Sequence, residues 1–161
     1  MQQPKIISQD VVAHIQNPIP HIKITSHYDM KGNIIGLDTV QNTVIKNSNY
    51  DYRYILGLFN SSFTSWYTYK FIYCSAIRTM HFDNYYLGKI IVPAISKEEQ
   101  KPIIELVDKI LSITKVDNYL QNPLKQAQVK EYERQIDRIV YELYDLTDEE
   151  IAIVKGGDKS N

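Results

Sequence analysis

The side chains with the clearest chemical potential for recognition lie close together, between residues 75 and 86. They are Ser75, Arg78, Thr79, His81 and Asn84. An arginine guanidinium can donate a forked pair of hydrogen bonds to guanine, an asparagine amide can pair with adenine, and hydroxyl and imidazole groups serve as adaptable donors or acceptors. The segment is therefore a candidate for contact with DNA bases. The alternative is an ordinary surface loop in which Arg78 pairs with Asp83.

Four cations near this segment could contact the phosphates of a nucleic acid. They are Lys46, Arg53, Lys70 and Lys89. Each is equally well explained as a solvated surface charge. The distribution of charge gives limited support, because residues 1–92 hold eight Lys and Arg against five Asp, a net of +3, whereas residues 93–161 hold ten against fourteen acids, a net of −4. Long helices that accumulate Glu would produce the same asymmetry.

The sequence lacks the residues that methyl transfer, metal-dependent DNA cleavage or metal binding would require. No glycine-rich phosphate loop occurs, and residues 17–20 (Asn-Pro-Ile-Pro) lack the second adjacent proline and the aromatic of a base-flipping methyltransferase loop, so we interpret them as a turn. Glu99-Gln100-Lys101 supplies only a fragment of a metal-dependent nuclease motif. The four His are scattered and Cys74 is the single cysteine, so neither a metal site nor a catalytic residue is expected in this chain.

The elements that must position these residues are predicted by periodicity and turn signals. Residues 5–14 and 21–27 alternate like strands around the proline-rich turn, and residues 34–45 suggest a further strand of a small mixed sheet. From Asp51, a plausible N-cap, apolar and aromatic residues recur every three or four positions to Phe71, which predicts a buried amphipathic helix. Residues 74–84 lose this periodicity and form a loop, and residues 85–93 resemble a short closing strand.

The rear of the chain is predicted to be helical. Ser96 with Glu99 and Thr147 with Glu150 have capping-box spacing, and Pro102 suggests an irregular or kinked start to the first helix. Asn122-Pro123 separates two long amphipathic stretches, which predicts an antiparallel helical hairpin. The expected class is α+β, with residues 1–93 as one part, residues 94–155 as the hairpin and residues 156–161 as a flexible tail.

The order of these parts resembles the TaqI-like C-terminal specificity domain of type IIG and related restriction-modification DNA methyltransferases, and type I specificity subunits are similar. The resemblance is carried by residues 52–61 (YRYILGLFNS), 86–93 (YLGKIIVP), 99–100 with 103–111, and 136–147 with 149–151. It covers nearly the whole chain but only the rear of the family's longer architecture. The last of these segments is the most specific.

The resemblance implies a function and partners. In the family, the variable loop ahead of the closing strand faces DNA, so Arg78, Thr79, His81 and Asn84 are expected to contact the target. Double-stranded DNA and a methyltransferase domain of the parent protein are the expected partners, with S-adenosylmethionine as the cofactor of that domain and none in this chain. A protein-interaction or dimerisation scaffold that acts through the hairpin is the alternative, and a nuclease is a third.

The composition predicts a soluble cytoplasmic protein. A single cysteine suits a reducing compartment, the first nine residues lack the features of an export signal, and no apolar run approaches the length of a membrane span. The 43% of hydrophobic residues are enough to build a core.

Overall fold

The computed structural model describes residues 3–17 and 20–156, and it confirms the α+β class. A three-stranded sheet has the order β3-β1-β4, formed by β1 (Lys5–Gln9), β3 (Ser26–Asp29) and β4 (Val40–Thr43). A two-stranded sheet joins β2 (Val11–Val12) to β5 (Met80–His81). Every pair between these strands is antiparallel, so the expectation of a mixed sheet was wrong.

The strands are shorter than the sequence pattern predicted. Residues 34–39 precede β4 without strand structure, and the turn predicted at residues 17–20 is flanked by an antiparallel bridge between Ile15 and His21. Pro18 and Ile19, within that turn, lie outside the described residues, as does the predicted tail beyond Gly156.

The aromatic helix is broken into three pieces. α1 (Tyr52–Asn60) is capped by Asp51, as predicted, and is followed by α2 (Ser62–Tyr67) and the π-helical turn η1 (Thr68–Ile72). The break lies at Ser61, whose backbone is extended at φ −68° and ψ 152° and whose hydroxyl accepts a hydrogen bond from the Thr64 backbone. Serine favours such N-cap geometry because its side chain replaces a helical acceptor. The aromatic stripe packs into the core except at Phe71, which is 62% exposed.

The hairpin forms as predicted, from α4 (Lys97–Thr114) and α5 (Pro123–Leu143), joined through the 3-10 turn η2 (Tyr119–Gln121). Both predicted capping boxes are present, at the starts of α4 and of α6 (Asp148–Val154). α4 continues through Pro102, which lies in its second turn. By contrast, the closing strand expected at residues 85–93 is wrong, because the Asp83 carboxylate accepts hydrogen bonds from the backbones of Tyr85 and Tyr86 and starts the helix α3 (Asn84–Leu87).

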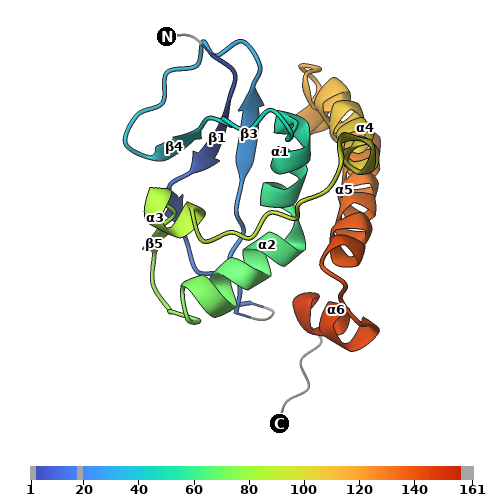
Figure 1. Cartoon of the computed structure of the whole chain (residues 1–161). Helices are drawn as coiled ribbons and strands as arrows, with labels where there is room; N and C mark the ends of the chain where they lie inside the picture. Colours follow the sequence, from blue (N-terminus) through green and yellow to red (C-terminus); the bar gives the residue numbers. More distant parts are fainter. Residues whose placement is uncertain (1–2, 18–19, 157–161) are drawn as a thin grey trace.

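α1 lies between the sheet and the hairpin (Figure 1). Six consecutive residues, 54–59, are buried, so this helix contributes apolar surface on all sides. One hydrophobic cluster joins Ile6 of β1, Leu58 of α1, Ile103 of α4 and Ile136 of α5. The parts predicted as residues 1–93 and 94–155 therefore share a core.

Gly57 sets the spacing between α1 and α4. A Cβ atom at this position would lie 2.5 Å from Cγ2 of Ile103 and 3.4 Å from Cγ2 of Val107. Both neighbours are β-branched and buried, so they have few alternative rotamers into which they could move. Only a residue without a side chain allows this approach.

We expect Gly57→Val to lower the free energy of unfolding by about 2 kcal/mol, because overpacking outweighs the better helix propensity of valine. Urea denaturation followed by circular dichroism would measure the change. The matched control is Ala127→Val on the exposed face of α5, which should cost about 0.5 kcal/mol from helix propensity alone. Equal losses for the two variants would contradict the close approach.

Candidate nucleic-acid interface

The segment with the candidate base-reading side chains is a tightly anchored loop between η1 and α3. Cys74 and Ser75 both adopt left-handed backbone conformations, with φ of 50° and 57°. The Ser75 amide donates to the Tyr69 carbonyl at 2.8 Å, and the Ala76 amide donates to the Tyr73 carbonyl at 3.0 Å. The chain thus reverses sharply at the end of η1 and is held there by backbone hydrogen bonds.

A second hydrophobic cluster supports this loop from beneath. Its buried members come from four separate stretches of the chain: Val12, Ile22, Ile24, Tyr69, Tyr73, Met80 and Phe82. Met80 and Phe82 point into this cluster, whereas Thr79, just before Met80, and His81, between Met80 and Phe82, are exposed. This alternation is typical of an extended strand. The hydroxyl of Tyr73 also donates to the His81 carbonyl at 3.0 Å. The loop therefore has a rigid underside and a polar outer side.

The structure brings four of the five predicted base-contacting residues to this outer side. Arg78, Thr79, His81 and Asn84 are exposed, and Ser75 is half-buried at the turn. Among the described residues Arg78 forms no ion pair, and its Nε lies 3.2 Å from the sulfur of Met80. The alternative pairing of Arg78 with Asp83 is not seen, since Asp83 caps α3.

His81 is oriented by a buried carboxylate. Its Nδ1 lies 2.7 Å from Oδ2 of Asp10, whose side chain is only 6% exposed, while the His81 side chain is 68% exposed. The Gln41 amide donates to the other oxygen, Oδ1, at 3.0 Å. The hydrogen bond from His81 holds the pKa of Asp10 below its usual value of 3.8. Because an ionised carboxylate only accepts hydrogen bonds, neutral His81 carries its proton on Nδ1 and leaves Nε2 as an acceptor.

The four predicted phosphate-contacting cations have different surroundings. Lys46 and Lys70 are exposed, and the amine of Lys70 lies 5.7 Å from the ring centroid of Tyr69. Lys89 is exposed and lies 4.0 Å above the Tyr85 ring, and a hydrogen bond with Tyr85 raises the pKa of this lysine.

Arg53 is the exception among these cations. Its guanidinium forms ion pairs with Asp51 at 2.8 Å and with Asp108 of α4 at 2.9 Å. The hydrogen bond with Asp51 raises the pKa of Arg53 and lowers that of Asp51. Both anionic partners come from this chain, so the geometry gives Arg53 a role in tying α1 to α4.

In Glu99-Gln100-Lys101, the fragment of a nuclease motif, Glu99 and Gln100 have structural roles. Glu99 completes the capping box with Ser96, and its hydrogen bonds with Ser96 lower its pKa. Gln100 is buried, accepts from the Asp51 amide at 2.9 Å and donates to the Asn49 carbonyl at 2.7 Å. Within residues 3–17 and 20–156, no group of three or more His, Cys, Asp or Glu side chains could hold a metal ion.

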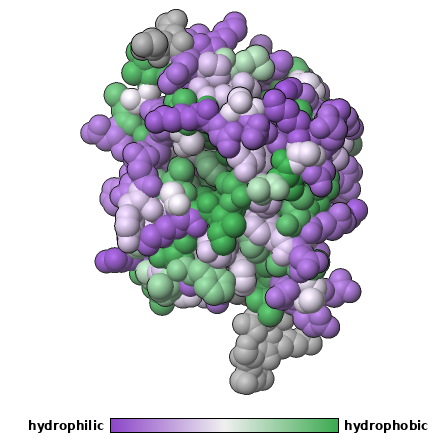
Figure 2. All heavy atoms as spheres, viewed as in Figure 1, coloured by the Kyte–Doolittle hydropathy of each residue, from purple (hydrophilic) through white to green (hydrophobic). Residues whose placement is uncertain are grey.

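Exposed apolar residues beside the loop were missed by sequence reasoning. Ile77 is 73% exposed, Tyr85 67% and Phe71 62%. Figure 2 shows further hydrophobic side chains in the middle of one face of the molecule. In the same view, the segment after α3 crosses in front of α1 and α2 (Figure 1). Ile91 of that segment is 58% exposed. Nothing local in the sequence marks such exposure, since it depends on which neighbours cover a residue.

We expect Asp10→Asn to lower the free energy of unfolding by about 1–2 kcal/mol at pH 7, because it removes the charge of a nearly buried carboxylate that His81 and Gln41 hydrogen-bond. The folded-state pKa of Asp10 is depressed, so this contribution exists above pH 3.8 and is lost as the pH falls through the folded value. The gap between wild type and variant should therefore close below about pH 4. Denaturation curves at several pH values would measure it, with the exposed Asp38→Asn as control. A gap that is constant with pH would point to packing instead.

Comparison with known proteins adds one finding: no protein-family model and no curated protein matches this sequence. None of the described helices is both long and apolar enough to cross a membrane. The assignment of function therefore depends on the chemistry of the residues themselves and on the resemblance noted above.

Proposed function

We propose that this chain is a DNA target-recognition module, the specificity portion of a restriction-modification methyltransferase. In this proposal the loop at residues 75–84 enters the major groove and reads base edges. Lys70 and Lys89 contact flanking phosphates and set the register. A separate methyltransferase domain of the parent protein, with S-adenosylmethionine, flips and methylates the base.

The observation that carries this proposal is the outward presentation of Arg78, Thr79, His81 and Asn84 from a loop that is anchored at both ends and packed beneath. Recognition side chains gain from a rigid support, because less conformational entropy is lost on binding. The carboxylates nearest to the loop are also occupied internally, Asp10 by His81 and Gln41 and Asp83 by the cap of α3. Among the described residues, none of Arg78, Lys70 and Lys89 forms an ion pair, so these cations are available to an anionic partner.

The oriented imidazole adds a chemical preference. In the tautomer with its proton on Nδ1, His81 presents Nε2 as an acceptor, which suits the exocyclic amino group of adenine or cytosine in the major groove. Arg78 presents donors, which suit O6 and N7 of guanine. The two residues would thus read bases of opposite hydrogen-bonding character.

A second candidate function, association through the hairpin, is favoured by a different observation. Near the hairpin turn, Leu120 is 75% exposed, Leu124 83% and Val116 43%. By contrast, Ile103 and Val140, in the interior of the hairpin, are fully buried in the shared core. Any surface for another subunit on the hairpin would therefore lie at its turn.

We expect the full chain to bind duplex DNA with an affinity that falls as salt increases, because phosphate contacts release counterions. Selection from a pool of random duplexes, followed by sequencing, would give the preferred site. Arg78→Ala should relax the preference at one or two positions and cost about 1–3 kcal/mol of binding free energy. Lys70→Ala should weaken binding to all sequences alike.

Lys101→Ala, on the exposed face of α4, is the matched control and should leave both affinity and preference unchanged. The assignment of the loop is wrong if the wild-type protein retains no duplex at low salt. It is also wrong if Arg78→Ala, like the control Lys101→Ala, selects the same sequences as the wild type. Unaltered circular dichroism spectra of the variants would exclude misfolding.

For the second candidate, we expect Leu120→Glu with Leu124→Glu to abolish any concentration-dependent association of the chain, since charges at exposed apolar positions oppose burial. Sedimentation equilibrium over a hundredfold range of concentration would measure the molecular mass. Both positions are exposed, so the unfolding free energy should change by no more than about 0.5 kcal/mol. A monomeric wild type throughout that range would remove self-association from consideration.

A further inference from the structure

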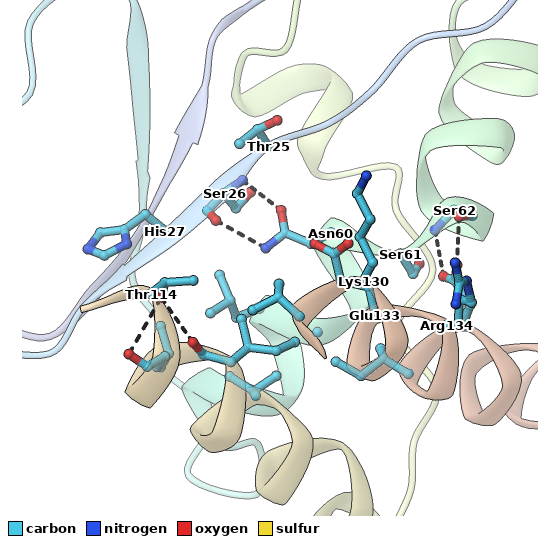
Figure 3. Close-up of a pocket in the computed structure, with 18 of the residues that line it drawn as sticks. Thr25, Ser26, His27, Asn60, Ser61, Ser62, Thr114, Lys130, Glu133 and Arg134 are labelled. Atoms are coloured by element: carbon cyan, nitrogen blue, oxygen red, sulfur yellow. Dashed lines mark hydrogen bonds between the residues drawn. The ribbon is translucent and has the colours of Figure 1, made fainter. Parts of the chain in front are cut away.

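A cavity of about 450 Å³ lies between the sheet and the helical hairpin, away from the proposed DNA-reading loop. Its walls come from residues 23–27 in and before β3, the end of α1 with the start of α2, and the facing sides of α4 and α5 (Figure 3). None of the candidate DNA-contacting residues lines it. This volume falls within the range typical of small-molecule sites.

The deep part of the cavity is apolar. Its lining side chains are Leu56, Val107, Ile110, Leu111, Val129 and Ile136. Leu56, Val107, Val129 and Ile136 are each at most 6% exposed, so their remaining surface faces the cavity or the core. An aliphatic or aromatic group placed here would gain dispersion contacts and leave water, both of which favour binding.

The mouth of the cavity is polar and carries cations from opposite walls. Lys23 precedes β3, and Lys130 projects from α5 on the side of Asn60 (Figure 3). Neither lysine forms an ion pair with any residue that the structure describes. Arg134 also lines the mouth and pairs with Glu131 at 2.9 Å.

The polar groups around these lysines are largely occupied within the chain. Asn60 forms two hydrogen bonds with the backbone of Ser26, at 2.8 and 3.0 Å. The carboxylate of Asp137 accepts from the amide and the hydroxyl of Ser62, at 2.8 and 2.7 Å. Burial raises the pKa of Asp137, which reduces its negative charge at low pH. Glu133 is the remaining acid of the lining and is exposed at the rim.

We propose that this cavity binds an amphipathic anion, with its apolar chain against the floor and its carboxylate or phosphate head between Lys23 and Lys130. An apolar floor without charge selects the chain, and two cations without internal partners select an anionic head. The ligand would touch both the β3 wall and α5. It would therefore stabilise the seating of the hairpin against the sheet.

A small amphiphile suits this site better than a protein segment. A docked amphipathic helix requires a groove that accepts anchor residues over two or more turns, whereas the apolar floor here is enclosed on three sides by β3, α1 and the hairpin. The exposed apolar residues Leu120 and Leu124 are not part of the lining. The floor therefore does not extend to the exposed residues at the hairpin turn.

Calorimetric titration of the full chain with four probes of equal chain length tests the proposal. Octanoate, octyl phosphate and 1-octanol share the apolar chain and differ in the head, and octylammonium reverses the charge. We expect octanoate and octyl phosphate to bind, 1-octanol to bind about tenfold more weakly and octylammonium not to bind detectably. A stronger response to octyl phosphate than to octanoate would assign the natural head as a phosphate, and the reverse would assign it as a carboxylate.

Variants locate the site. Lys23→Gln with Lys130→Gln should weaken octanoate binding by about tenfold and leave 1-octanol unchanged, whereas Arg138→Gln, at an exposed position of α5 outside the lining, should change neither. Ile110→Trp, at a half-buried lining position, should weaken all probes by filling the floor. Methyl NMR shifts of Leu56 and Val129 on titration would confirm the location without any variant. Absence of binding by all probes at millimolar concentration, equal affinity for all of them, or binding of an acidic peptide in their place would overturn the proposal.

Discussion

The close approach of α1 to α4 at Gly57 is the constraint on which the rest of the structure depends. α1 is buried along six consecutive residues, and its two sides face the sheet and the hairpin. Because Gly57 has no side chain, Ile103 and Val107 pack directly against the α1 backbone. The ion pair of Arg53 with Asp108 and the hydrogen bonds of Gln100 add polar contacts to the same interface. The position of the hairpin relative to the sheet follows from this contact.

The loop proposed to read DNA depends on a different set of contacts. It rests on the smaller cluster that contains Tyr73, Met80 and Phe82, and its edge is joined to the sheet through Asp10, which holds His81. A buried carboxylate that orients an exposed imidazole fixes which nitrogen faces outward. The structure therefore separates two roles: the main core holds the two halves of the chain together, and the smaller cluster stiffens one surface loop.

The two proposed sites are physically independent because each lies over a different hydrophobic cluster. The amphiphile cavity is enclosed by residues of the main core and by the facing sides of α4 and α5, whereas the DNA-reading residues lie over the smaller cluster. α2 and η1 connect them, because α2 begins at the cavity wall and η1 ends at the loop. A ligand that stiffens the cavity would act on the loop only through this short helical segment.

Local sequence determined the elements whose signals act over a few residues. The capping boxes at Ser96 and Thr147, the N-cap at Asp51 and the break at Asn122-Pro123 were predicted because each depends on side chains within one helical turn. Tertiary structure decided what depends on distant partners: the buried Asp10 beside His81, 71 residues away, and the cavity walls, which come from four separate stretches. It also decided between competing local signals, since Ser61 breaks the aromatic helix and Asp83 starts a helix where a strand was expected. Periodicity records which residues are apolar, but only packing determines which neighbours cover them.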